Sequence, residues 1–276
     1  MKDLLKLYSF ESVHGSDDER NICDWICKWL DAHHVTGYTR HGNNIYRKTE
    51  AGDIILSAHL DQVKTNGKAV KFFMTPDEII TAYNDKWQRT SLGADDKNGI
   101  WIILKMLEMY PDSLSFIITA GEETGLIGIH KLQSAGVLDK ILSEKDTQCI
   151  VLDRRGNNEI LDAGSSGKYC KTLAQDMCNF LDSGYTTGTG SCSDTNVLSD
   201  YCESVNMSVA YTGAHSANES TDFKALKKIK NDVACVLENF VHYNTPVSKY
   251  KTFLPTTTKK EEKKYEQSYW WNRKYF

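Results

Sequence analysis

The sequence has no long uninterrupted apolar segment. No run of apolar residues approaches the ~20 that a membrane-spanning helix needs, so we expect no membrane partner. Residues 1–6 also lack an apolar stretch that ends in a small-residue cleavage site. We therefore expect no signal peptide and a cytoplasmic protein.

The cysteine spacing of a structural zinc site is missing too, because none of the eight cysteines forms a CxxC pair. Their scattered positions, in a long chain without a secretion signal, argue against a disulfide framework. Cys23 and Cys27 are four residues apart, so a helix would place both on one face as small apolar side chains.

An excess of basic residues is also absent. Thirty-three Lys and Arg stand against 37 Asp and Glu, for a net charge of −4 and a pI near 6.1. This balance gives no general attraction to nucleic acid, and we expect no such partner. The 276 residues suffice for one large α/β domain or two small ones.

Strand-like and helical segments alternate along the chain. Ser16 and Glu19 form a capping box before a helical apolar stripe that runs to Leu30. We expect strands at 53–59, 115–120, 148–153 and 205–211, and further helices at 99–110, 128–135, 168–180 and 221–242. Residues 183–193 are rich in Gly, Ser and Thr and predict a loop. The alternation predicts an α/β fold, with a mixed, mostly parallel sheet sandwiched between helices.

Acidic and imidazole side chains occur at or just after the ends of these apolar segments. Because ligands bind at strand ends in open α/β sheets, we expect these side chains to converge on one cleft. The candidates are His59, Asp61, Asp95, Glu122, Glu123, Asp153 and His215.

Three carboxylates and two imidazoles are a donor set that suits a pair of metal ions. Zinc accepts both kinds of ligand, and two such ions sit ~3.5–4 Å apart when they share a substrate. One carboxylate must then bridge the ions, since two dications at that distance repel strongly. A further acid is needed to take a proton from water.

Each candidate also has an ordinary structural interpretation. Asp95 and Asp96 could cap the helix at 99–110, Glu122 and Glu123 could form a solvated turn, and Asp153 could cap a turn. All of these alternatives would have to hold together, in this order, to explain the pattern without a site.

The ordered motifs resemble those of the co-catalytic di-zinc exopeptidases, a superfamily of aminopeptidases, tripeptidases, carboxypeptidases and deacylases. The resemblance covers roughly residues 50–240. It rests on His59-Leu60-Asp61, Gly93-Ala94-Asp95-Asp96-Lys97, Glu122-Glu123-Thr124-Gly125 and His215.

The resemblance implies a role for each residue. Asp95 would bridge two divalent ions, zinc by expectation, with cobalt or manganese as alternatives. His59 and Asp153 would complete one ion's ligands, and Glu123 and His215 the other's. As catalytic residues, Glu122 would be the general base for a water shared by the ions, and Asp61 would orient the His59 ring. The Asp95–Asp96 peptide would be cis.

Two features depart from the family pattern. Lid-bearing members insert a dimerisation domain between the third carboxylate and the last histidine, but here only residues 154–214 lie between them. We expect one lidless catalytic domain at 1–255, a charged and aromatic tail at 256–276, and any oligomer to form without a lid. The usual Tyr before a Ser-Asp pair is missing at Ser193-Asp194, so Tyr185, Tyr211 or the metals alone would stabilise the oxyanion.

The leading functional hypothesis is a metal-dependent exopeptidase that cleaves short peptides, most simply from the amino end. Arg154 and Arg155 keep a carboxypeptidase or amide deacylase open. The alternative from another class is a peptidase-fold binding module that acts through its aromatic tail, against which an intact Glu122 argues.

Overall fold

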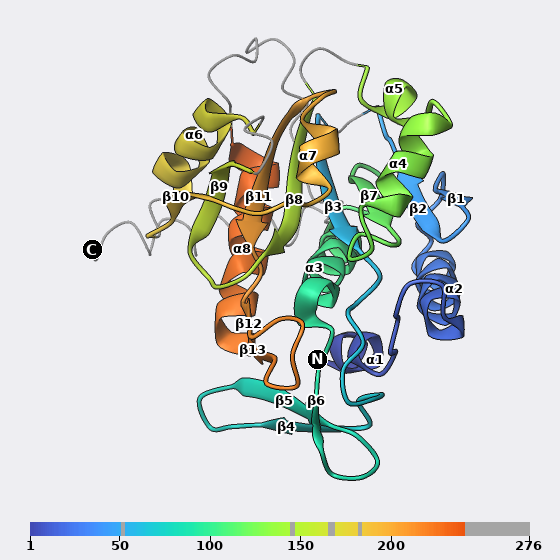
Figure 1. Cartoon of the computed structure of the whole chain (residues 1–276). Coiled ribbons are helices and arrows are strands. Elements are labelled where there is room, and N and C mark those ends of the chain that lie inside the picture. Colours follow the sequence, from blue (N-terminus) through green and yellow to red (C-terminus); the bar gives the residue numbers. More distant parts are fainter. Residues whose placement is uncertain (51–52, 144–146, 165–168, 182–183, 241–276) are drawn as a thin grey trace, which may run out of the picture.

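The computed structural model describes residues 1–50, 53–143, 147–164, 169–181 and 184–240 (Figure 1). The tail expected at 256–276 lies outside the described residues, as do the last residues of the helix expected at 221–242. In the described part of the chain, no helix combines the length and apolar character that crossing a bilayer requires.

The centre of the fold is an eight-stranded mixed sheet. Its pairs β3–β7, β3–β8, β8–β11 and β9–β10 are parallel, and β1–β2, β2–β7 and β9–β11 are antiparallel. In spatial order the strands are β1 (Thr39–His41), β2 (Asn44–Arg47), β7 (Ser115–Thr119), β3 (Ile54–His59), β8 (Gln148–Arg154), β11 (Glu203–Ser208), β9 (Glu159–Ala163) and β10 (Thr186–Thr189).

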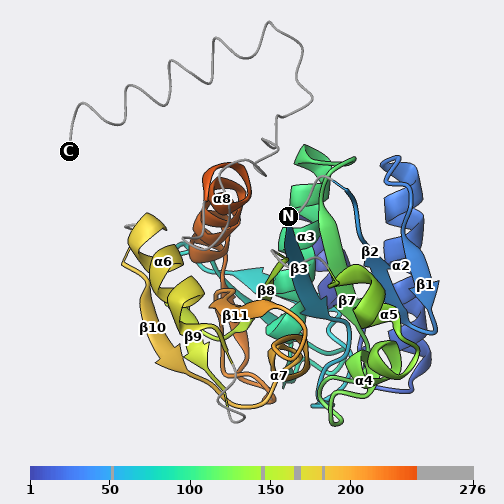
Figure 2. The ribbon, with the colours of Figure 1, turned by 90° about the horizontal axis from the view of Figure 1, so that it is seen from above.

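Helices cover both faces of this sheet (Figure 2). One face packs against α1 (Lys2–Tyr8), α2 (Asp17–Ala32), α3 (Ala94–Met109), α6 (Lys171–Leu181) and α8 (Phe223–Asn239). The other packs against α4 (Ile127–Ser134), α5 (Val137–Ile141) and α7 (Thr195–Leu198). Along β3, Leu56 belongs to the first core and Ile55 to the second, because successive side chains of a strand point to opposite faces. The predicted fold class is confirmed.

The predicted cap of α2 is present, with one difference. The Ser16 hydroxyl accepts a hydrogen bond from the Glu19 backbone N–H, at 3.2 Å. The Glu19 carboxylate accepts from the N–H of Gly15, at 3.1 Å, rather than from the N–H of Ser16. The Ser16 N–H instead donates to the carbonyl of Val13.

A second, smaller sheet was not predicted. It contains β12 (Tyr211–Thr212), β13 (Ser220–Asp222), β5 (Ile79–Tyr83) and β4 (Lys71–Met74) in that order, and β6 (Arg89–Thr90) also pairs with β5. It lies below the main sheet in Figure 1. The segment 62–92, for which no strand was predicted, supplies three of its strands.

Other boundaries also differ from the prediction. The strand expected at 205–211 is divided: β11 ends at Ser208, Ala210 has a positive φ of 64°, and Tyr211 begins β12 in the other sheet. The loop expected at 183–193 contains the edge strand β10. The helix expected from 99 belongs to α3, which begins at Ala94 but has non-helical φ and ψ at Asp95 and Asp96, so that regular helix starts after Asp96. Asp96 accepts from the Gly99 N–H at 3.1 Å, as a capping residue would.

Gly99 marks the close approach of α3 to the sheet. A Cβ atom at this position would lie 2.2 Å from the Leu152 carbonyl oxygen and 2.6 Å from Asp96 Oδ1. We expect Gly99→Ala to lower the free energy of unfolding by about 1–3 kcal/mol, the usual cost of overpacking. Denaturant unfolding measures this, with Lys131→Ala on the exposed face of α4 as the control. An unchanged midpoint for Gly99→Ala would contradict this packing.

Candidate functional site

The sheet topology brings the predicted side chains to one edge. Strands β3, β7 and β8 are parallel neighbours, so their carboxyl ends lie together. His59 is the last residue of β3, Asp153 lies near the end of β8, and Glu122 and Glu123 follow β7. Asp95 arrives at the start of α3, where the Asp95–Asp96 peptide is cis, as the resemblance implies.

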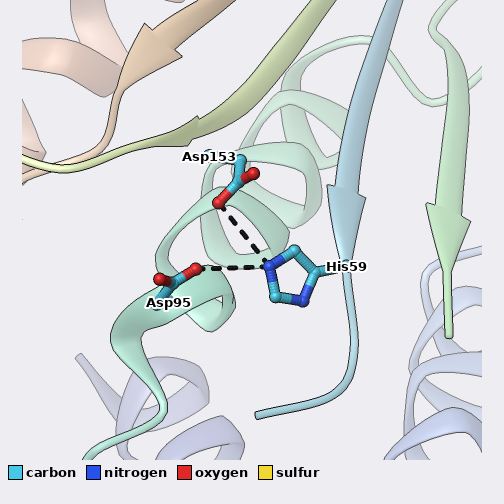
Figure 3. Close-up of side chains that lie close together, drawn as sticks. All are labelled: His59, Asp95 and Asp153. Carbon is cyan, nitrogen blue, oxygen red and sulfur yellow. Dashed lines mark hydrogen bonds and ion pairs between the residues drawn. The ribbon is translucent and has the colours of Figure 1, made fainter. Parts of the chain in front are cut away.

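Three of these side chains form a first cluster, which we call site 1: His59, Asp95 and Asp153. His59 Nε2 lies 3.2 Å from Asp95 Oδ1 and 3.6 Å from Asp153 Oδ1. Figure 3 shows both carboxylates pointing at the same imidazole nitrogen. One ring nitrogen and two carboxylate oxygens therefore converge on a common point.

A second cluster, which we call site 2, contains Asp95, Glu123 and His215. His215 Nε2 lies 2.8 Å from Glu123 Oε1 and 3.4 Å from Asp95 Oδ2. Asp95 thus belongs to both sites and directs Oδ1 at His59 and Oδ2 at His215. This is the arrangement that a bridging carboxylate requires.

Asp61 lies behind the site and contacts the two glutamates as well as His59, the only contact that was predicted for it. Its carboxylate accepts hydrogen bonds from the backbone N–H groups of Glu122 and Glu123, at 2.9 and 3.0 Å. The Nδ1 atom of His59 lies 3.1 Å from the Asp61 backbone oxygen and 3.5 Å from its Oδ1. The hydrogen bond to the backbone leaves Nε2 facing the cluster, while the carboxylate positions the two glutamates.

The site concentrates negative charge in a buried place. Burial and the repulsion of Asp153 raise the pKa of Glu122 to about 9. Burial and the neighbouring Asp95 raise the pKa of Asp153 to about 7. Such mutually repelling carboxylates, grouped with two imidazoles, have the donor chemistry and the charge that fit divalent cations.

A cavity of about 360 Å³ opens onto both clusters. Its walls include residues from the end of β8 and the turn after it, from the segment after β10, and from the loop between β12 and β13. The lining includes Asp95, Glu122, Glu123, Asp153, Arg154, Arg155, Leu161, Ser191, Cys192, Tyr211 and His215.

The structure distinguishes Tyr185 from Tyr211, the two tyrosines that were expected as alternatives for stabilising the oxyanion. Tyr211 lines the cavity, and its hydroxyl donates to the Asp153 carbonyl oxygen at 3.2 Å. The Tyr185 hydroxyl donates to Asp232 on α8, at 2.9 Å. Tyr211 is therefore the one of the two that can face a substrate.

Three buried acids behind the site were not predicted as site residues. Asp96 accepts from the backbone N–H of His59, at 3.1 Å. Asp194 accepts from the Thr119 hydroxyl, and burial raises its pKa to about 6. Glu219 accepts from the backbone N–H of Asp95. The adjacent Asp95-Asp96 and Ser193-Asp194 pairs were visible in the sequence, but Glu219 follows no motif.

The state of His215 gives a measurable consequence for metal binding. Its hydrogen bonds to Asp95 and Glu123 raise its pKa to about 10, so it is protonated at pH 7 in metal-free protein. A metal ion needs the neutral imidazole and must displace that proton. We expect zinc binding at pH 7 to release protons, seen as a calorimetric heat that changes with the buffer's ionisation enthalpy. Equal heats in all buffers would contradict this, and His215→Ala should release fewer protons.

No protein-family model matches the chain, and no curated protein matches its sequence. Solved structures do match. A tripeptidase from Staphylococcus aureus superposes with a TM-score of 0.68 at 16% identity, over 85% of this chain and 95% of that chain. Aminopeptidase PepT from Bacillus cereus superposes with a TM-score of 0.64 at 15% identity, over 86% of this chain and 96% of that chain. The TET1 peptidase from Pyrococcus horikoshii superposes with a TM-score of 0.64 at 14% identity, over 87% of this chain and 100% of that chain. The chain therefore has the fold of these tripeptidases and aminopeptidases, which confirms at the level of fold the resemblance that its motifs predicted.

Proposed function

We propose that the protein is a metal-dependent aminopeptidase that hydrolyses short peptides. The observation that carries this proposal is the Asp95 carboxylate, whose two oxygens face the imidazoles of two separate donor sets. The peptidase fold of the neighbours agrees with it. The pairing of a shared carboxylate with two histidines is the geometry that a two-metal hydrolase needs.

The donor sets divide between two ions. Site 1 would hold one ion through His59, Asp95 and Asp153, and site 2 the other through Asp95, Glu123 and His215. Zinc suits these nitrogen and oxygen donors, and cobalt or manganese would also fit. When bound, a pair of metal ions lowers the pKa of a water molecule and polarises the carbonyl group of the peptide.

Glu122 is suited to the role of general base. It lines the cavity, and its Oε2 lies 3.9 Å from His59 Nε2, beside site 1. Asp61 holds the backbone N–H of Glu122, which fixes the start of the side chain. Bound cations beside Glu122 would lower its raised pKa, and the ionised carboxylate can then take a proton from a water in the cavity and later give it to the leaving amine.

The walls of the cavity favour an unblocked amino end on the substrate. Glu122, Glu123 and Asp153 place carboxylates next to the metal sites, where a free peptide amine finds partners. Tyr211 lies in the same cavity, where its hydroxyl can turn from the Asp153 carbonyl oxygen and donate to the developing oxyanion instead.

Arg155 supports the second candidate function. It is exposed and lines the same cavity, and it follows Asp153 by two residues. A guanidinium there would attract a substrate carboxylate, as a carboxypeptidase or an amide deacylase requires. The acidic walls nearer the metal sites favour the aminopeptidase.

The domain organisation also remains part of this proposal. The small sheet takes strands β4 to β6 from the segment between Asp61 and Asp95, whereas the family's lid would lie between Asp153 and His215. This placement supports a single catalytic domain, in which the described residues of 154–210 supply β9, α6, β10, α7 and β11 of the main sheet and its covering helices.

The proposal is tested by metal removal and a matched peptide panel. A chelator should abolish hydrolysis, and added zinc, cobalt or manganese should restore it, because the chemistry needs the ions. The reloaded protein should cut unblocked di- and tripeptides and should cut their amino-acetylated counterparts poorly, because acetylation removes the amine's charge and adds bulk.

Two results would contradict the proposal in different ways. Hydrolysis that survives complete metal removal would refute the metal-dependent mechanism. A clear preference for the acetylated peptides would refute the aminopeptidase and favour the deacylase or carboxypeptidase.

Adjacent glutamates should behave differently when neutralised. Glu122→Gln keeps the size of the side chain but removes the proton acceptor, so we expect both ions to remain bound while kcat falls by about two to four orders of magnitude. Glu123→Gln should weaken binding of the site 2 ion instead. Metal content and kcat are measured for both variants. Equal metal loss in the two would show that the roles are assigned wrongly.

A further inference from the structure

His215 is carried by a short hairpin loop rather than by the main sheet. Residues 213–219 connect β12 to β13, and the strands pair through Thr212 and Ser220. The backbone of His215 has a positive φ of 61°, and its side chain is 52% exposed. A ligand on such a loop needs an anchor if it is to keep a fixed place relative to Asp95.

Glu219, at the end of this loop, reaches across to the segment that carries Asp95. It is only 1% exposed. One carboxylate oxygen accepts from the Asp95 backbone N–H at 3.1 Å, and the other accepts from the Ser91 hydroxyl. Ser91 in turn accepts from the Gly93 N–H at 2.8 Å. One carboxylate therefore holds the turn that leads into α3.

Glu219 also satisfies a backbone donor in the turn that precedes the regular part of α3. Asp95 and Asp96 have non-helical φ and ψ, so the Asp95 N–H lies in this turn and not in the helix that follows. Gly93, at the start of the turn, has no side chain that could accept a hydrogen bond. Glu219 accepts the Asp95 N–H from a segment more than 120 residues away in the sequence.

Other contacts hold the loop but do not reach the bridging ligand. The Arg89 guanidinium donates to the carbonyl oxygens of Ala217 and Glu219, at 3.3 and 3.4 Å, and joins the loop to the small sheet. The Ser216 hydroxyl donates to the Gly213 carbonyl at 2.7 Å, within the loop. The hydrogen bond of Glu219 differs because it joins the His215 loop directly to Asp95.

We propose that Glu219 is a positioning residue that fixes His215 relative to Asp95 and so sets the affinity of site 2. The inference rests on the proposed two-metal function. The other ligands of site 1, His59 and Asp153, come from the paired strands β3 and β8, whereas the carboxylate of Glu219 hydrogen-bonds to Asp95 and Ser91. Loss of this anchor should therefore weaken site 2, which depends on it for both His215 and Asp95, more than site 1, which depends on it for Asp95 alone.

Two substitutions of Glu219 distinguish the effect of its side-chain length from the effect of its charge. Glu219→Asp keeps the charge but withdraws the carboxylate by about 1.5 Å, one C–C bond, which is too far for both hydrogen bonds. Glu219→Gln keeps the reach: its oxygen can accept from Asp95, and its NH₂ can donate to Ser91, since a hydroxyl also accepts. Both changes are small enough for the buried position to tolerate.

The measurement is calorimetric titration of metal-free protein with zinc, with Asp77→Asn, exposed between β4 and β5, as the control. Wild type and the control should bind two ions. Glu219→Asp should bind the second ion about 10–100-fold more weakly, the usual effect of losing a group that orients a ligand, and should weaken the first ion clearly less. Glu219→Gln should stay close to wild type.

Each contrary result has a separate meaning. Two ions bound unchanged by Glu219→Asp, or both ions weakened equally, would overturn the positioning role. A Gln variant weaker than the Asp variant would show that charge, rather than reach, matters, and would also overturn it. A wild-type protein that binds fewer than two ions would refute the proposed function itself, and the inference with it.

Discussion

The close packing of like charges is the constraint around which this structure is built. Four carboxylates line one cavity, and further buried acids stand directly behind it. Backbone N–H groups make this crowding tolerable: Asp61 takes those of Glu122 and Glu123, and Asp96 takes that of His59. Such fixed dipoles stabilise negative charge without neutralising it. The inner ring of acids can then keep its oxygens free for cations.

The two sheets contribute to this arrangement in different ways. The central strands of the main sheet are buried on both faces, so β3 and β8 fix His59 and Asp153 with little freedom. The small sheet contributes Ile80 and Ala82 to the first core, but its strand β4 exposes apolar side chains, Phe73 and Met74. The site thus joins a rigid half, set by the sheet, to a half that depends on individual hydrogen bonds such as that of Glu219.

Secondary structure is predicted correctly from the sequence where the pattern of apolar residues within one segment is enough to identify the element. The strands at 53–59, 115–120 and 148–153 are continuous apolar runs, and each lies where it was expected because burial on both faces leaves such a pattern. The ordered acids and histidines were predicted to converge, and they do. The small sheet was missed because its strands are two to five residues long and half exposed, and β5 pairs with β13, far along the chain. Glu219 was missed for a related reason, since an isolated glutamate looks solvated until the tertiary structure buries it.

The pairing of β5 with β13 also has a kinetic meaning. Ile80 and Thr221 are register partners, so this part of the small sheet forms only after most of the chain has found its place. Contacts of such long sequence separation require closure of a large loop and form slowly. His59 and Asp153 belong to strands that pair over a shorter stretch of chain. The hairpin that carries the last histidine is therefore held in register by residues from distant parts of the chain, and its place at the site reports the completion of the native topology.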